Sequence, residues 1–479
     1  MPVINSAKQN IINNIAGGKF AKRSFLLITS QGTRMLAQIV IIFIYSRHLS
    51  FKEYGAYQSV WLYVNVISTL SLFGLPSLIM SASQKNIYTS VKDNKKHFFI
   101  AGSIVNFLPL LFLLLAVHEF SIGSKLLIIM LIICQNISIL AEAITIKKEK
   151  EMLLLISNII FAIGYFACHI FILYTGYSLE LLVAVLILIF AIKATTLLWL
   201  NKQNIEDPVN TLSPTTGRQW FYLGVVDSLS VLFKWIDKWI ILFFLSVSQF
   251  AIYFNGSYEI PVLGLMVSGV GNIMLIELSK HSHKSSAASK ILFTNSSLLL
   301  ASIVFPSFAF LLFYHSYFFT FIFSAKYVAS IPIFFVSIFI LPVRITNYGA
   351  TLQVYNRNDL VVKGALIDII IAVILMAFLY PFMGMKGLAL AFVISTYIQA
   401  WYYLWHTSNL INQKIVSFFP LKKLLLLMVI SILLLGTTYA ICNRLPYPLN
   451  MIIGVAVCSL LIISLLYLSI KRSNWSFLS

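Results

Sequence analysis

The chain has 479 residues, of which 59% are hydrophobic and only 10% are charged. Soluble domains carry about 25% charged residues, so this chain cannot cover a water-facing surface, and lipid must be its main solvent. The formal net charge of +19 does not indicate a nucleic-acid partner, because the Lys and Arg residues lie in short connections between apolar runs rather than on one basic face.

Apolar runs recur along the whole chain at the length that a membrane helix needs, about 20 residues. They predict an all-α integral membrane protein with about fourteen transmembrane helices. The expected spans are 24–46, 58–82, 98–117, 125–145, 152–174, 179–200, 219–245, 256–278, 291–314, 328–346, 361–381, 387–406, 421–442 and 449–470.

The connections between these spans alternate in charge. Those placed on the side of the N-terminus hold roughly four times as many Lys and Arg residues as those on the opposite side, which is the asymmetry that keeps loops in the cytoplasm. An even number of spans then returns the chain to the same side. We therefore expect a multi-pass protein with both termini cytoplasmic.

Two segments of the chain resemble each other. Residues 48–57, after the first span, and residues 244–253, after the seventh, share Leu, Ser and a final Tyr at a constant offset. The repeat predicts two parallel lobes of six helices. The expected divisions are an N-terminal lobe at 1–200, a cytoplasmic linker at 201–218, a C-terminal lobe at 219–408, and two additional spans with a cytoplasmic tail at 409–479.

Three segments carry a resemblance to a known family. They are residues 46–57 with the following 72–76, residues 237–253, and residues 380–391 before the twelfth span. At these positions the chain resembles the polysaccharide-biosynthesis flippases of the multidrug/oligosaccharidyl-lipid/polysaccharide (MOP) exporter superfamily, in particular the O-antigen (Wzx-like) branch.

The resemblance implies two lobes around a central cavity and transport by alternating access in the bacterial inner membrane. It implies an oligosaccharide substrate linked to undecaprenyl diphosphate, for O-antigen, other lipopolysaccharide or capsule biosynthesis. Membrane lipids, and contacts with polysaccharide polymerase and chain-length machinery, would be its partners. Coupling to H⁺ or Na⁺ is left open. No cofactor or metal is expected.

Arg34 lies about ten residues into the first span, or about 15 Å deep at 1.5 Å per residue. A guanidinium at that depth cannot easily reach the headgroups. Ionisable residues within spans usually face a cavity or a partner. Arg34 therefore either faces the cavity or hydrogen-bonds a neighbouring helix.

The seventh span carries the most charge. Asp227, Lys234, Asp237 and Lys238 fall on one helical face,, which predicts that this face lines a cavity. The alternative is internal pairing of Lys234 with Asp237 or Asp227, used only for packing. The acids are also candidates for ion coupling, because buried carboxyl groups titrate readily.

Three further ionisable residues lie within spans. Arg344 follows Pro342 and either lines a kinked helix or reaches the membrane surface. Lys193 lies close enough to the cytoplasmic end of its span to extend towards lipid phosphates. Asp368, in the eleventh span, is a candidate for ion coupling or for pairing within the cavity.

These basic groups predict a diphosphate site. Guanidinium binds phosphate with two hydrogen bonds, and ammonium acts as a point charge. Arg34, Lys234, Lys238 and Arg344 are the candidate substrate-binding residues. Gly74-Leu75-Pro76 in the second span and Pro261 to Gly264 in the eighth interrupt equivalent helices, which indicates either a moving region or close packing.

Two other functions remain open. A MATE-like small-molecule or drug antiporter belongs to the same superfamily, but intramembrane bases outnumber acids here. A membrane-embedded glycan polymerase or ligase would need a sizeable extramembrane loop, and no connection is long enough. The sequence holds no P-loop, metal-ligand cluster or nucleophile elbow, so we expect a transporter and not an enzyme.

Overall fold

The computed structural model is helical throughout the part of the chain that it describes, namely residues 19–81, 95–117, 119–202, 216–258, 260, 263–264, 267, 270, 286–355 and 357–472. These residues form two compact units, Met1–Trp235 and Ile236–Ser479. The boundary falls inside one helix, α10. The predicted divisions at 1–200, 201–218, 219–408 and 409–479 remain a prediction.

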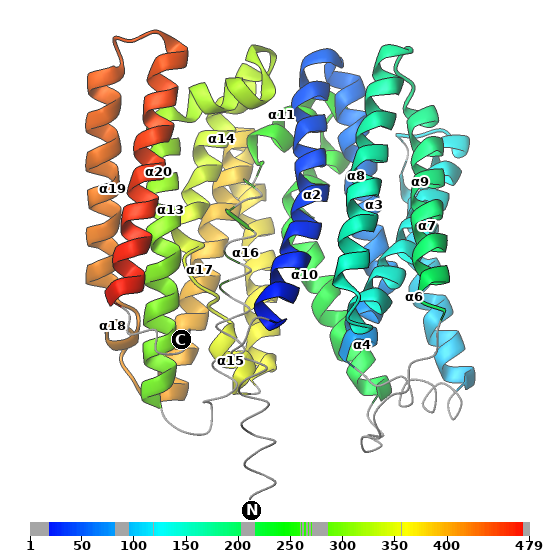
Figure 1. Ribbon diagram of the computed structural model, residues 1–479, viewed down its shortest axis with the longest axis horizontal. Helices are drawn as coiled ribbons and strands as arrows, with labels where there is room; N and C mark the ends of the chain where they lie inside the picture. The colour runs from blue at the N-terminus through cyan, green and yellow to red at the C-terminus, as the bar shows by residue number, and fades with distance from the viewer. Residues whose placement is uncertain are drawn as a thin grey trace, which may run out of the picture. The chain divides into compact units, whose positions relative to one another are not determined.

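The first unit holds seven helices and most of an eighth among its described residues (Figure 1). They are α2 (Lys19–His48), α3 (Phe51–Leu72), α4 (Leu75–Ser81), α6 (Lys95–Ala116), α7 (Ile122–Lys147), α8 (Glu151–Tyr174), α9 (Leu179–Leu200) and α10 (Thr216–Phe244). Its main packing pairs are α7 with α9 and α2 with α8.

The second predicted span is two helices. α3 ends where Phe73 (φ 40°) and Gly74 (φ 74°) take left-handed conformations, and α4 begins at Leu75. A Cβ on Gly74 would lie 2.5 Å from the backbone nitrogen of Gly224 in α10. The interruption is therefore also a point of close helix packing, which is one of the two alternatives for this glycine, and its role in a moving region stays a prediction.

The second unit continues from the end of α10. Its elements are α11 (Val247–Gly256), α13 (Ser286–Phe323), the 3₁₀ helix η1 (Ala325–Ser330), α14 (Ile331–Ser337), the 3₁₀ helix η2 (Ile338–Val343), α15 (Ala350–Val354), α16 (Asn358–Met383), α17 (Met385–Ile411), α18 (Ile415–Phe418), α19 (Leu421–Cys442) and α20 (Tyr447–Arg472).

One of the predicted spans in this unit is not a simple α-helix, and another lies mostly outside the described residues. The span expected at 328–346 consists of η1, α14 and η2, with Pro342 inside η2. Proline lacks the N–H group that an α-helix uses, and its ring clashes with the preceding turn, so the α-helix does not continue through Pro342. Most of the span expected at 256–278, including Pro261, lies outside the described residues.

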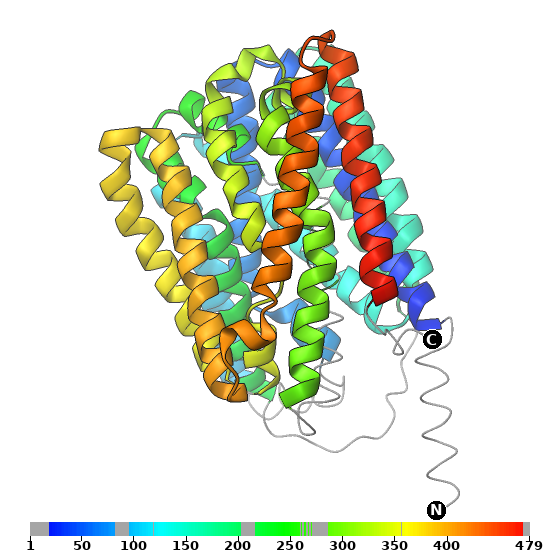
Figure 2. The same cartoon turned by 90° about the vertical axis from the view of Figure 1, so that its left-hand side faces the viewer.

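The last two spans pack on α13. Figures 1 and 2 show α19 and α20, in orange and red, lying side by side against it. Small residues permit the contact, because a Cβ on Gly436 would lie 2.8 Å from the ring of Phe313 and one on Gly454 would lie 2.6 Å from the ring of Tyr314. This is the use of glycine that is common between membrane helices.

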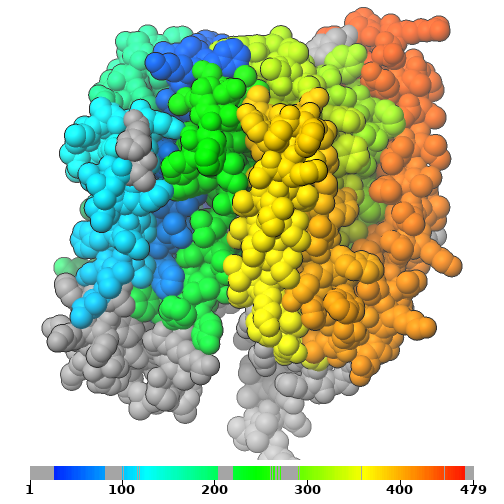
Figure 3. All heavy atoms as spheres, turned by 180° about the vertical axis from the view of Figure 1, so that it is seen from behind, coloured from blue at the N-terminus to red at the C-terminus, as the bar shows by residue number. Residues whose placement is uncertain are grey.

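In the described part of the chain, nine helices are long and apolar enough to cross a membrane, and two shorter apolar helices accompany them. Large apolar side chains are exposed along their outer faces. Those of α16, the yellow helix seen along its length in Figure 3, include Ile370, Ile374, Phe378 and Phe382. Such a surface needs lipid around it, so the chain is a multi-pass, all-α membrane protein, as predicted.

The sequence repeat corresponds to a structural one. Ser50 caps α3 and Ser246 caps α11, each accepting a hydrogen bond from the backbone three residues on, at Glu53 and Gln249 respectively. The side chains of Glu53 and Gln249 return a bond to the capping residue, so both helices begin with a complete capping box,. The repeated sequence thus encodes the same helix start in each unit.

Candidate functional site

A buried ionic cluster lies in the first unit, and Arg34 of α2 is part of it. Its Nη1 donates to both carboxylate oxygens of Glu142 in α7, at 2.9 and 3.0 Å. The side chain of Arg34 is 30% exposed, so it is held by Glu142 and only partly buried. Its Cζ also lies 5.8 Å from the ring centre of Phe161.

Lys193 of α9 completes this cluster. Its Nζ lies 2.5 Å from Oε1 of Glu142 and 2.6 Å from Oδ1 of Asn158 in α8. Asn158 in turn donates to the hydroxyl of Ser30, one turn from Arg34. The expectation that Lys193 extends to lipid phosphates is wrong, because its side chain is only 3% exposed and an acid from another helix holds it inside the unit.

The cluster as a whole carries an excess of positive charge. Arg34 and Lys193 share the single carboxylate of Glu142. One acid neutralises one base, so the site keeps about one net positive charge in a region of low dielectric constant, where it attracts an anion strongly. The structure thus shows the hydrogen bond to a neighbouring helix, one of the two alternatives for Arg34, and its role in a cavity stays a prediction.

The other candidates of the first unit make separate contacts. Asp227 of α10 accepts a hydrogen bond from the hydroxyl of Ser77 at 3.1 Å. Lys234 is exposed, and its ammonium lies 5.4 Å from the ring centre of Trp235. The pairing of Lys234 with Asp227 or Asp237, considered from the sequence, is not among the ion pairs of the described residues.

The second unit contains a cavity of about 500 Å³. Asp237 and Lys238 lie in its wall, and the two form a buried ion pair with 3.1 Å between Nζ and Oδ2. The hydroxyl of Tyr253 donates to the same carboxylate oxygen at 3.1 Å. The charge of Asp237 is therefore neutralised by Lys238, the next residue in the chain, and its carboxylate also accepts a hydrogen bond from Tyr253 of α11.

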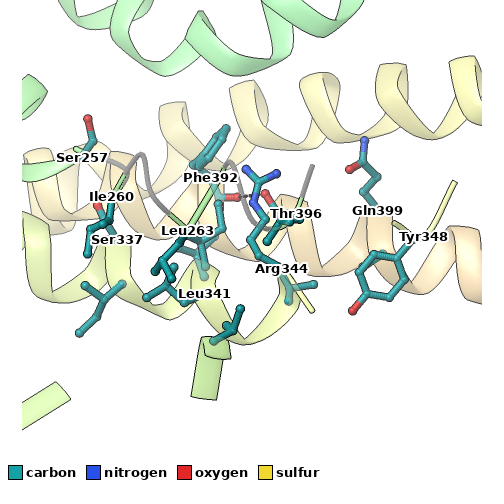
Figure 4. Close-up of a pocket in the computed structure, with 18 of the residues that line it drawn as sticks. Ser257, Ile260, Leu263, Ser337, Leu341, Arg344, Tyr348, Phe392, Thr396 and Gln399 are labelled. Atoms are coloured by element: carbon teal, nitrogen blue, oxygen red, sulfur yellow. Dashed lines mark hydrogen bonds between the residues drawn. The ribbon is translucent and has the colours of Figure 1, made fainter. Parts of the chain in front are cut away.

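Arg344 lies in the same cavity, at the end of η2 (Figure 4). Its side chain extends among Phe392, Thr396 and Leu341 in that view. Of the two roles left open for Arg344, lining a kinked segment is the one consistent with this position. With Lys238 and Asp237, it gives the charged part of the lining two bases and one acid.

Asp368 of α16 is fully buried but does not line the cavity. Among the described residues, no donor meets hydrogen-bond geometry at either of its carboxylate oxygens. The Ser395 hydroxyl, the Arg344 guanidinium and the Tyr403 hydroxyl act on it electrostatically. A buried carboxyl with so few partners is costly to keep ionised, which makes a bound cation or proton favourable there.

Sequence reasoning did not single out Glu142 or Asn158. Glu142 lies near the end of an apolar run, where an acid is unremarkable, and nothing local shows that helices α2 and α9 bring two bases to it. One signal in the sequence could have pointed to such a partner. Intramembrane bases are in excess in the N-terminal half, and buried charges require partners of opposite sign.

No protein-family model matches the chain, and no curated protein matches it. Solved structures do. The lipid II flippase MurJ, in an inward closed conformation, has a TM-score of 0.67 at 15% identity, and the match covers 94% of this chain and all of that one.

Two further structures are similar over 84% of this chain. A MOP superfamily transporter from Pyrococcus furiosus, described as having a binding pocket of reverse polarity, has a TM-score of 0.59 at 11% identity, with 98% of that chain covered. An outward-facing MATE multidrug resistance transporter has a TM-score of 0.56 at 12% identity, with 99% of that chain covered. The chain therefore has the fold of the MOP superfamily transporters.

Proposed function

We propose that the chain is a Wzx-like flippase that moves a lipid-linked oligosaccharide repeat unit, carried on undecaprenyl diphosphate, from the cytoplasmic to the outer leaflet of the bacterial inner membrane. Transport would proceed by alternating access of the two units. Its fold, shared with a lipid II flippase, supports this proposal, as do the sequence motifs that resemble polysaccharide flippases.

The observation that carries the proposal is the excess of positive charge in the interior of both units. Arg34 and Lys193 surround one acid in the first, and Lys238 and Arg344 accompany one acid in the lining of the second unit's cavity. Buried charge is expensive for a membrane protein. An anionic cargo that must pass through a region of low dielectric constant is a reason to retain it.

The diphosphate of such a cargo needs several cationic contacts. Arg34 is anchored on Glu142 and its side chain is partly exposed, so it is the group that we assign to phosphate in the first unit. Arg344 and Lys238 line the cavity of the second unit, where we assign them to other parts of the anionic cargo, and exposed Lys234 is a further candidate for the phosphate. Guanidinium suits phosphate because it donates two parallel hydrogen bonds.

Asp368 is the acid that we assign to coupling with H⁺ or Na⁺. Asp237 is occupied by Lys238 and Tyr253, and Asp227 is held by Ser77. Those two acids fit the alternative role of pairing within the structure. Contacts with polysaccharide polymerase and chain-length machinery belong to the same proposal and rest on the family resemblance.

The test is deletion of the gene followed by analysis of lipid-linked glycan. A flippase predicts accumulation of repeat units that face the cytoplasm, together with loss of the surface glycan. Unchanged glycan with altered tolerance to cationic drugs would instead favour the antiporter, which shares the fold. The positive lining argues against a cationic drug, since like charges repel.

A further inference from the structure

The cavity of the second unit has a lining suited to a sugar. Beyond its charged residues, it presents amide side chains at Asn347, Gln353 and Gln399, and hydroxyl groups at Ser257 and Thr396. Each amide offers both donors and an acceptor. A lipid chain could form no hydrogen bonds with these uncharged polar groups. A ligand covered with hydroxyl groups could, so the lining suits such a ligand.

Several of these polar groups have hydrogen-bonding capacity to spare. Gln399 donates to the carbonyl of Gly364 at 3.5 Å, the long limit of a hydrogen bond,. The hydroxyl of Ser257 is more than nine-tenths buried and has no partner among the described residues. A buried hydroxyl without a partner costs free energy, and a hydroxyl-bearing ligand would remove that cost.

Aromatic rings occur alongside the polar groups. Tyr348 and Phe392 line the cavity, and Figure 4 shows Gln399 and Tyr348 together at one end of the group of side chains, with Arg344 and Thr396 next to them. A pyranose presents an apolar face of C–H groups and an edge of hydroxyl groups. Rings for the face and amides for the edge are the two kinds of contact that it needs.

The size and charge of the cavity argue against two other occupants, a diphosphate and a cationic drug. Its volume of about 500 Å³ falls within the range of about 300–1,000 Å³ for small-molecule sites, which admits one or two sugar rings. Lys238 is paired with Asp237, so the lining lacks the cluster of cations that a diphosphate requires. Arg344 adds a positive charge that opposes an amine or a cationic drug.

We propose that this cavity is a glycan subsite, which holds a neutral or acidic sugar of the cargo while its diphosphate lies elsewhere, and that Gln399 and Gln353 determine its specificity. The inference rests on the proposed function, because it assumes a glycan-bearing lipid as cargo. It goes further by separating recognition of the sugar from recognition of the phosphate.

The experiment compares two probes on the purified full-length protein. One is bare undecaprenyl diphosphate, and the other is the lipid-linked glycan extracted from cells in which this protein has been deleted. The variants are Gln399→Met and Gln353→Met, two independent substitutions that keep side-chain length and remove the amide. Gln413→Met, outside the cavity, is the matched control.

Either cavity variant should weaken binding of the glycan-bearing lipid by about tenfold, the effect of one lost hydrogen bond to a buried partner. Binding of the bare lipid should not change, and the Gln413 variant should resemble the wild type. Arg34→Ala should weaken both probes. Equal weakening of both probes by the cavity variants, or unchanged affinity for the glycan-bearing lipid, would overturn the subsite. A wild-type protein that binds neither probe contradicts the proposed function itself.

Discussion

Arg34 and Lys193 donate to the same oxygen atom, Oε1 of Glu142, from two different helices. The carboxylate is the one acid of this cluster and neutralises only one of its two bases. Lys193 is buried and cannot move to water when the acid is lost. The stability of the first unit and the position of Arg34 therefore both depend on Glu142.

Replacing Glu142 with Gln should destabilise the protein. Removing one partner of a buried ion pair typically costs about 3–5 kcal/mol, because it leaves an uncompensated charge. The loss here should lie toward the lower end, since Arg34 is partly exposed. The thermal midpoint of detergent-purified protein checks this, with Glu180→Gln, an exposed acid of α9, as the control. Equal midpoints for the two variants would show that the cluster does not stabilise the unit.

Gly74 offers a second stability test. Its φ of +74° already disfavours any side chain, and a Cβ would meet the backbone of Gly224 at 2.5 Å. Gly176 has a φ of +97° with nothing within 4 Å, so Gly176→Ala measures the backbone cost alone, about 1 kcal/mol. Gly74→Ala should lower the thermal midpoint by clearly more. If the two variants lose the same stability, the contact of Gly74 with α10 does not stabilise the protein.

The positions of the helices could largely be predicted from the sequence. The span expected at 421–442 coincides with α19, because the apolar length that crosses a bilayer is set by its thickness. The polar contacts could not be predicted in the same way. Lys193 lies at a depth that permits snorkelling, and only the fold brings Glu142 and Asn158 to its ammonium.

The pairing of Asp237 shows the same limit. Helical spacing suggested Lys234, one turn away, as its partner, whereas the structure gives it Lys238 and Tyr253. Tyr253 comes from α11, which follows the turn after α10. The spacing of residues within α10 therefore cannot predict this contact. Local spacing identifies which residues share a face, but contacts between elements decide which charges remain available to a ligand.

Asp368→Asn tests ion coupling. The substitution keeps the shape of the side chain and removes its charge, so a cation or proton no longer neutralises it. We expect transport of lipid-linked glycan in the variant to become insensitive to the proton and sodium gradients and to fall in rate. Asp359→Asn, on the exposed first turn of α16, is the control. Wild-type transport that survives collapse of both gradients would remove Asp368 from this role.

The central claim is that positive side chains inside the protein bind an anionic lipid-linked glycan, and Arg34 tests it most directly. Cells lacking the gene are complemented with wild type, Arg34→Lys or Arg34→Ala, each present in the membrane at equal levels. The measurement is the fraction of lipid-linked repeat units that face the cytoplasm.

Arg34→Ala should leave the repeat units facing the cytoplasm. Arg34→Lys should restore export in part, because it keeps the charge but loses the two parallel hydrogen bonds. Full export by Arg34→Ala at wild-type levels would contradict the claim that this guanidinium binds the diphosphate.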